Sequence, residues 1–89
     1  AGEAVATQPG NGVRYVIPQT VHKNGKDVSL FMRVTQPFGR VKFTVSSGDT
    51  VLTTVKRLKA APGEMEKITL KADQLALADE PITVTLEEL

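Results

Sequence analysis

The sequence predicts an all-β domain, built as a small antiparallel sandwich of six or seven strands. Valine, isoleucine and threonine, whose branched side chains favour strands, account for 24 of the 89 residues. Turn signals recur about every 8–12 residues, and no stretch has the periodicity of a long helix. This pattern is typical of an immunoglobulin-like β-sandwich, and a small barrel is the alternative.

The start of the chain has no strand periodicity. Residues 1–12 are small and polar and contain glycine and proline, which is typical of a linker or tail. The sandwich domain is therefore expected to span residues 13–89. Because the first residue is alanine, we expect either a domain excised from a longer polypeptide or a processed, secreted chain.

Two strands are expected in the first half of the domain. Residues 13–17 place Val13, Tyr15 and Ile17 on one face, and Pro18 should bend the strand or confine it to an edge. After the turn dipeptide Asn24-Gly25, residues 27–35 form the clearest strand. Its expected inward side chains are Val28, Leu30, Met32 and Val34. Its expected outward side chains are Ser29, Phe31, Arg33 and Thr35.

A hairpin is expected next, joined by the tight turn Ser47-Gly48-Asp49. The inward side chains of residues 40–46 are expected to be Val41, Phe43 and Val45. In residues 51–59 the inward set shifts from Val51, Thr53 and Val55 to Leu58. This shift predicts a β-bulge or a one-residue change of phase.

The end of the chain is expected to hold two further strands. Residues 67–71 should turn Ile68 and Leu70 inward, and Pro81 should open the last strand. Between them, residues 73–78 predict a helical turn capped by Asp73. All of these connections are short, so antiparallel neighbours are expected.

Composition excludes several functions. The chain has 11 basic and 10 acidic residues, a net charge of +1, and no cysteine. A nucleic-acid module usually has a clear basic excess, and cysteine chemistry requires thiols. With His22 as the one histidine, a Ser–His–Asp triad or a transition-metal site lacks parts. No apolar run approaches the roughly 18 residues of a membrane span. We expect a non-catalytic chain.

The charged residues offer only weak chemical candidates. Carboxylate pairs for glycoside hydrolysis are conceivable, as are calcium ligands and a metal at His22, but solvated surface charge is the favoured interpretation. The carboxylates considered are Glu64, Glu66, Glu87 and Glu88 for hydrolysis, and Asp49, Asp73, Asp79 and Glu80 for calcium.

Protein contacts are the better candidates. Phe31 and Arg33 are expected side by side on an outer face, a pair common in interfaces, although a loop or residues 1–12 covering that face is an equal alternative. The short basic run of Lys56, Arg57 and Lys59 indicates either a patch for acidic partners or a solvent face that discourages edge pairing.

Three stretches together resemble one protein family. They read VRYVIPQTV at residues 13–21, VSLFMRV at 28–34 and AAPGEMEKITL at 60–70. They are similar to the C-terminal tail of bacterial FAD-dependent pyridine nucleotide-disulfide oxidoreductase-like proteins. These NAD(P)/FAD-dependent dehydrogenases lie near anaerobic glycerol-3-phosphate dehydrogenase. The resemblance spans nearly the whole expected domain, residues 13–86.

The resemblance implies a role without chemistry of its own. FAD and NAD(P) would bind upstream parts of a parent oxidoreductase, and no catalytic, cofactor-binding or metal residue transfers to this chain. The implied role is subunit docking, oligomerisation or structural support, with the flavoprotein core or a partner subunit as partner, in the cytoplasm. The alternative is a secreted immunoglobulin-like module of an adhesin or glycan-active enzyme, although the chain is poor in the aromatic residues that stack on sugars.

Overall fold

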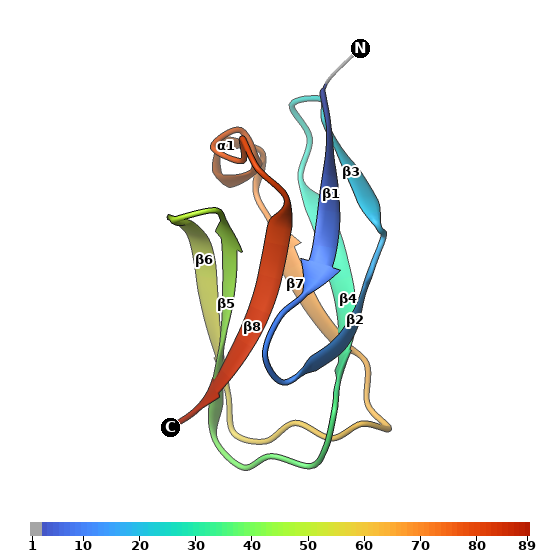
Figure 1. The fold of residues 1–89 in the computed structure, drawn as a ribbon, viewed down its shortest axis with the longest axis vertical. Coiled ribbons are helices and arrows are strands. Elements are labelled where there is room, and N and C mark those ends of the chain that lie inside the picture. The colour runs from blue at the N-terminus through green and yellow to red at the C-terminus, as the bar shows by residue number, and fades with distance from the viewer. Residues whose placement is uncertain (1–2) are drawn as a thin grey trace.

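The computed structural model describes residues 3–89 and confirms the all-β prediction. Within these residues, eight strands form two sheets, rather than the six or seven strands expected, and the chain has one short helix (Figure 1). In chain order the elements are β1 (Glu3–Pro9), β2 (Val13–Ile17), β3 (Thr20–Lys23), β4 (Val28–Val34), β5 (Val41–Ser47), β6 (Thr50–Arg57), β7 (Glu66–Leu70), α1 (Ala72–Leu75) and β8 (Ile82–Glu88).

The sheets contain five and three strands. The five-stranded sheet has the order β3-β1-β8-β5-β6, and the three-stranded sheet has the order β2-β4-β7. The chain passes from one sheet to the other at Pro18, between β2 and β3, so the bend expected at this proline is confirmed. The connection holds β1 close to β2, and the larger sheet therefore curls around one side of the smaller one (Figure 1).

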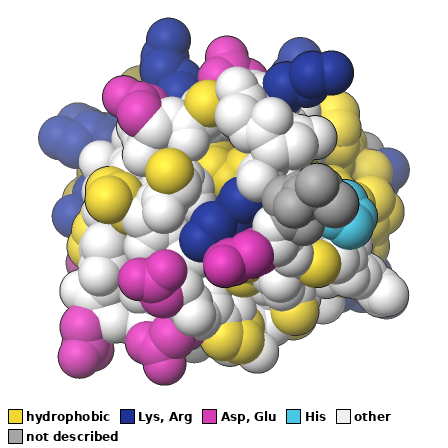
Figure 2. All heavy atoms as spheres, turned by 90° about the horizontal axis from the view of Figure 1, so that it is seen from above, with side chains coloured by type: hydrophobic (Ala, Val, Ile, Leu, Met, Phe, Trp, Pro, Cys, Tyr) yellow, Lys and Arg dark blue, Asp and Glu magenta, His cyan; other side chains and the backbone are white. Residues whose placement is uncertain are grey.

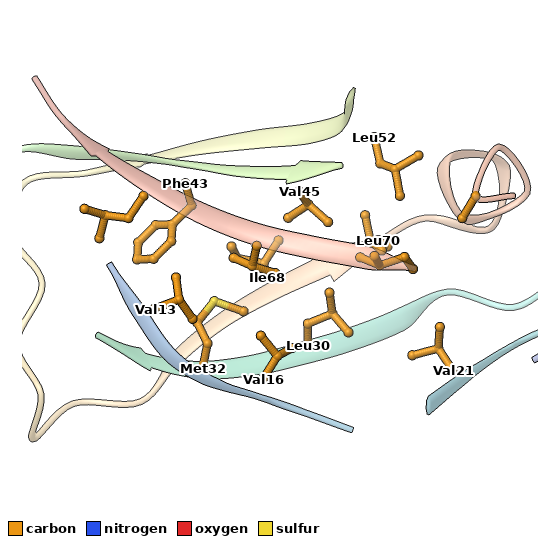
Figure 3. Packing of buried hydrophobic residues seen from close by; sticks show 14 of the residues in the cluster. Val13, Val16, Val21, Leu30, Met32, Phe43, Val45, Leu52, Ile68 and Leu70 are labelled. Carbon is orange, nitrogen blue, oxygen red and sulfur yellow. The ribbon is translucent and has the colours of Figure 1, made fainter. Parts of the chain in front are cut away.

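The core lies between the sheets and follows the expected alternation in β4, β5 and β7. Figure 3 shows side chains from both sheets meeting there, with Phe43 and Met32 on opposite sides of one layer. The fully buried side chains include Leu30, Met32, Val34, Val41, Phe43, Val45, Leu70, Ile82 and Val84. Their burial supplies the main driving force for folding, because each removes apolar surface from water.

The linker prediction is wrong for residues 3–9, which form β1. β1 pairs antiparallel with β3 and parallel with β8. The short-connection argument for antiparallel neighbours fails for β1 and β8 because the whole intervening chain joins them. Within β1 only Val5 is buried in the core, so the strand has almost no apolar alternation to detect. Residues 1 and 2 of the expected linker lie outside the described residues.

Chain contacts with β8 continue after β1 ends. The Gly10 N–H donates to the Val84 carbonyl at 2.8 Å, and the Leu86 N–H donates to the Asn11 carbonyl at 2.9 Å. A side chain at Gly10 would collide with Thr85, so glycine permits this close approach. Backbone hydrogen bonds, rather than side-chain burial, hold this segment in the sheet.

Parts of two expected inward faces are wrong, because bulges shift Ile17 in β2 and Val51 in β6 outward, whereas Val55 packs against the core as expected. In β2 the register changes between Val13 and Tyr15, so Val16 is buried and Ile17 is 47% exposed. In β6 the register shifts opposite Val45 and Ser46, and the extra residue of this bulge, Leu52, is buried. A bulge was expected in this hairpin, and the observed one lies near the turn. Leu58, which was expected to point inward, is 81% exposed. A bulge inserts one residue and inverts the alternation beyond it.

The expected helical turn is present as α1, but its expected cap is not. Asp73 lies in the first turn, and Lys71 occupies the N-cap position. The carboxylate that accepts a hydrogen bond from the Ala72 N–H belongs to Asp27, at 2.8 Å. Asp27 lies 45 residues earlier in the chain, so a local sequence pattern gives no sign of it. Leu75, in the helix, is buried against the core.

Candidate functional site

The outer face of the three-stranded sheet holds the strongest candidate surface. Alternation along β4 turns Phe31 and Arg33 outward, because Leu30, Met32 and Val34 are buried. The register sets Phe31 between Ile17 on β2 and Lys67 on β7, and it sets Arg33 opposite Tyr15. We call this surface, formed by Tyr15, Ile17, Phe31, Arg33 and Lys67, the outer β4 face.

The centre of the outer β4 face is apolar and accessible. Ile17 is 47% exposed, and Phe31 and Tyr15 are half-buried. Met65, one residue before β7, is 42% exposed beside this face. The bulge in β2 brings Ile17 to the face. The sequence signal for it is the spacing of Val13 and Val16, which simple alternation cannot bury together.

Arg33 also holds a loop in place. Its Nη1 donates to the Pro62 carbonyl at 3.1 Å, linking β4 to the connection between β6 and β7. This is the only hydrogen bond of the Arg33 side chain within the described part of the chain, and a guanidinium carries five N–H donors. Arg33 can therefore support the loop and still bind a carboxylate on a partner.

The three residues of the basic run do not form one patch. Lys56 lies on the outer face of the five-stranded sheet, opposite Lys42. Lys59 is exposed in the loop after β6. Arg57 pairs with Glu66, with its Nε 3.1 Å from Oε1, and its Nη2 donates to the Lys67 carbonyl at 3.3 Å. Arg57 thus joins the edge strands of the two sheets, and its role is structural.

The carboxylates and His22 are dispersed. Glu66 pairs with Arg57, Glu87 with Lys42, and Asp79 lies 3.7 Å from Lys23. His22 is exposed on β3. Within residues 3–89, no three side chains of the His, Cys, Asp or Glu types lie close enough together to hold a metal ion. The candidate calcium ligands Asp49, Asp73, Asp79 and Glu80 therefore form no such group.

An open cavity of about 600 Å³ lies near the end of β8. Its lining includes Asn11, Gln36, Phe38 and Glu88. These groups can contact a polar ligand, but the cavity lacks the apolar enclosure typical of small-molecule sites.

Across residues 3–89, no helix has the length and hydrophobicity needed to cross a bilayer.

Comparisons with protein-family models, with curated proteins and with solved structures gave no match.

Proposed function

We propose that this chain is a non-catalytic, immunoglobulin-like C-terminal module of a cytoplasmic FAD-dependent oxidoreductase, and that it docks against the flavoprotein core or a partner subunit. The observation that carries the docking role is the apolar centre of the outer β4 face, where Ile17 and Phe31 lie side by side. Two packed sheets of short strands support the immunoglobulin-like description.

The chemistry of the outer β4 face suggests its partner. Phe31 can serve as an aromatic anchor, with Arg33 and Lys67 as cations at its margin. The complementary surface is an apolar pocket bordered by carboxylates. Burying the face would remove apolar area from water at about 25 cal/mol per Å², although association costs offset much of that gain.

The resemblance at residues 13–21, 28–34 and 60–70 supports the flavoprotein part of the proposal. In this assignment FAD and NAD(P) bind other parts of the parent protein, and this chain contributes no group to the reaction. Its contribution is to hold subunits in position.

The parent protein can be identified directly. An antibody raised against this chain would be used to capture its target from native cell extract, followed by absorbance spectroscopy of the captured protein. We expect a protein several times larger than 9.6 kDa with a flavin spectrum. A colourless target, or one of 9.6 kDa, would overturn the flavoprotein assignment.

The docking face would then be tested in the full-length protein. Phe31→Asp places a charge in the centre of the outer β4 face, and we expect subunit association to weaken about tenfold or more. The matched control is Thr44→Asp, which places the same charge on an outward position of the five-stranded sheet. Equal association of wild type and Phe31→Asp, measured by light scattering, would remove this face from the interface.

A further inference from the structure

The charges of this chain are separated along its long axis. The molecule measures 39 × 21 × 17 Å between Cα atoms, and its strands run along the longest direction (Figure 1). One end, the acidic end, comprises the start of β1, the β3–β4 and β5–β6 turns, and α1 with the loop that follows it. The other end, the basic end, comprises the loops after β1, β4 and β6, the starts of β2, β5 and β7, and the ends of β4, β6 and β8.

The two ends have opposite formal charge. The acidic end, counted together with the adjoining residues Lys23 and Lys71, has six carboxylates and three cations. The carboxylates are Glu3, Asp27, Asp49, Asp73, Asp79 and Glu80, and the cations are Lys23, Lys26 and Lys71. The basic end, with the strand ends that belong to it, carries eight cations, Arg14, Arg33, Arg40, Lys42, Lys56, Arg57, Lys59 and Lys67, against four carboxylates, Glu64, Glu66, Glu87 and Glu88. The net charges are −3 and +4, which add to the +1 of the whole chain.

Each end also exposes two large aliphatic side chains. Val51 and Leu77, at the acidic end, are 56% and 57% exposed. Leu58 and Leu89, at the basic end, are 81% and 59% exposed. Figure 2 looks onto the acidic end, where carboxylates and apolar side chains are spread and Lys or Arg side chains lie near the centre and along the rim.

The register explains the composition of the basic end. Lys42 lies opposite Lys56 on β6 and Glu87 on β8, all on the outer face of the sheet. Two positions further toward the basic end, alternation brings Arg40, Leu58 and Leu89 to the same face. The Leu89 N–H donates to the Arg40 carbonyl at 2.9 Å, which keeps that row together. The two leucines therefore lie on either side of Arg40.

We propose that two copies of this chain associate end to end, with the basic end of one copy on the acidic end of the next. Opposite charges favour this orientation, and like charges disfavour contact between two identical ends. The exposed leucines and Val51 supply apolar area at the centre of the contact. The contact is heterologous, so repeated addition gives linear assemblies unless the geometry closes a ring.

The size of the ends limits the strength of this contact. The Cα cross-section of 21 × 17 Å is about 360 Å², compared with about 800 Å² per partner in a typical stable complex. The association is therefore weak, and salt weakens it because the charges are exposed. It does not depend on the proposed docking function, since it uses neither Phe31 nor the flavoprotein.

Sedimentation equilibrium of this chain tests the proposal. At about 1 mM protein and about 10 mM NaCl we expect an average mass above 9.6 kDa, falling toward the monomer at about 300 mM NaCl. The variant Lys56→Glu with Lys59→Glu reverses charges at the basic end, and we expect its association constant to fall about tenfold or more.

A matched control separates the site from net charge. The double variant Lys26→Glu with Lys71→Glu has the same net charge of about −3 as the first variant, since each change lowers the +1 of the chain by two. It places the added negative charge at the acidic end instead. We expect this control to associate as strongly as wild type or more strongly, and circular dichroism would verify that both variants fold. A wild-type monomer at low salt, or equal losses in both variants, would overturn the proposal. A monomer that instead binds phosphatidylserine vesicles would assign the basic end to a lipid surface.

Discussion

The two sheets bury similar side chains but present different outer faces. The outer β4 face carries Tyr15, Ile17 and Phe31 at its centre. The corresponding positions of the five-stranded sheet form rows of hydroxyl-bearing residues, in which Thr44 lies opposite Thr54 and Thr85. A β-branched side chain is sufficient to favour a strand, and threonine achieves this with a polar group facing water.

This difference indicates what folding requires of an outer face. The threonine rows show that the middle of an exposed sheet surface in this molecule needs no aromatic or large aliphatic residue, although Leu58 and Leu89 are exposed at its basic end. Ile17 and Phe31 are therefore not explained by strand formation alone. Exposed apolar patches on small domains are often binding surfaces, which is why the proposed docking role is assigned to the outer β4 face.

The largest expected effect contrasts the two faces of β4. Leu30 is completely buried, and Leu30→Ala should lower the free energy of unfolding by about 2–5 kcal/mol, because it removes packed atoms and leaves a cavity. The neighbouring Phe31→Ala should cost about 1 kcal/mol, the size of a cross-strand contact. Urea denaturation would measure both. Equal losses would mean that Phe31 belongs to the core rather than to an accessible face.

A smaller effect should separate inward from outward hydroxyls on β5. Ser47 is 4% exposed; its Oγ donates to the Glu80 carbonyl at 2.7 Å and accepts from the Glu80 N–H at 2.9 Å. Ser47→Ala leaves both backbone groups unsatisfied and should cost about 1–3 kcal/mol by thermal denaturation. Ser46→Ala, on the outer face, is the control and should change stability by less than about 0.5 kcal/mol. A similar cost for both would contradict the structural role of Ser47.

The smallest effects should distinguish the junction between the sheets from the outer surface. A double-mutant cycle with Arg57→Met and Glu66→Gln should give a coupling free energy of about 1 kcal/mol, because the Glu66 side chain is only 14% exposed. The same cycle for Lys42 and Glu87, 3.0 Å apart with a 61% exposed glutamate, should give about 0.2–0.5 kcal/mol. If added salt reduced both couplings equally, Arg57 would be an ordinary surface residue.

Strict alternation made β4, β5 and β7 predictable, and with them the outward position of Phe31 and Arg33. The errors came where a partner strand decides the structure. The bulge that exposes Ile17 depends on the pairing of β2 with β4, and the capping carboxylate of α1 comes from distant Asp27. Arg57 looked like part of a basic surface because its partner, Glu66, lies on a strand of the other sheet.

The sequence by itself determined the all-β class and most of the core, because an apolar residue at every second position can be buried only by placing one strand face against another layer. Only the tertiary structure decided that residues 3–9 complete a sheet, that bulges turn Val16 and Leu52 inward, and that opposite charges collect at opposite ends. These features rest on backbone pairing and on which turns share an end of the molecule. Both join residues that are far apart in the chain, so local patterns do not record them.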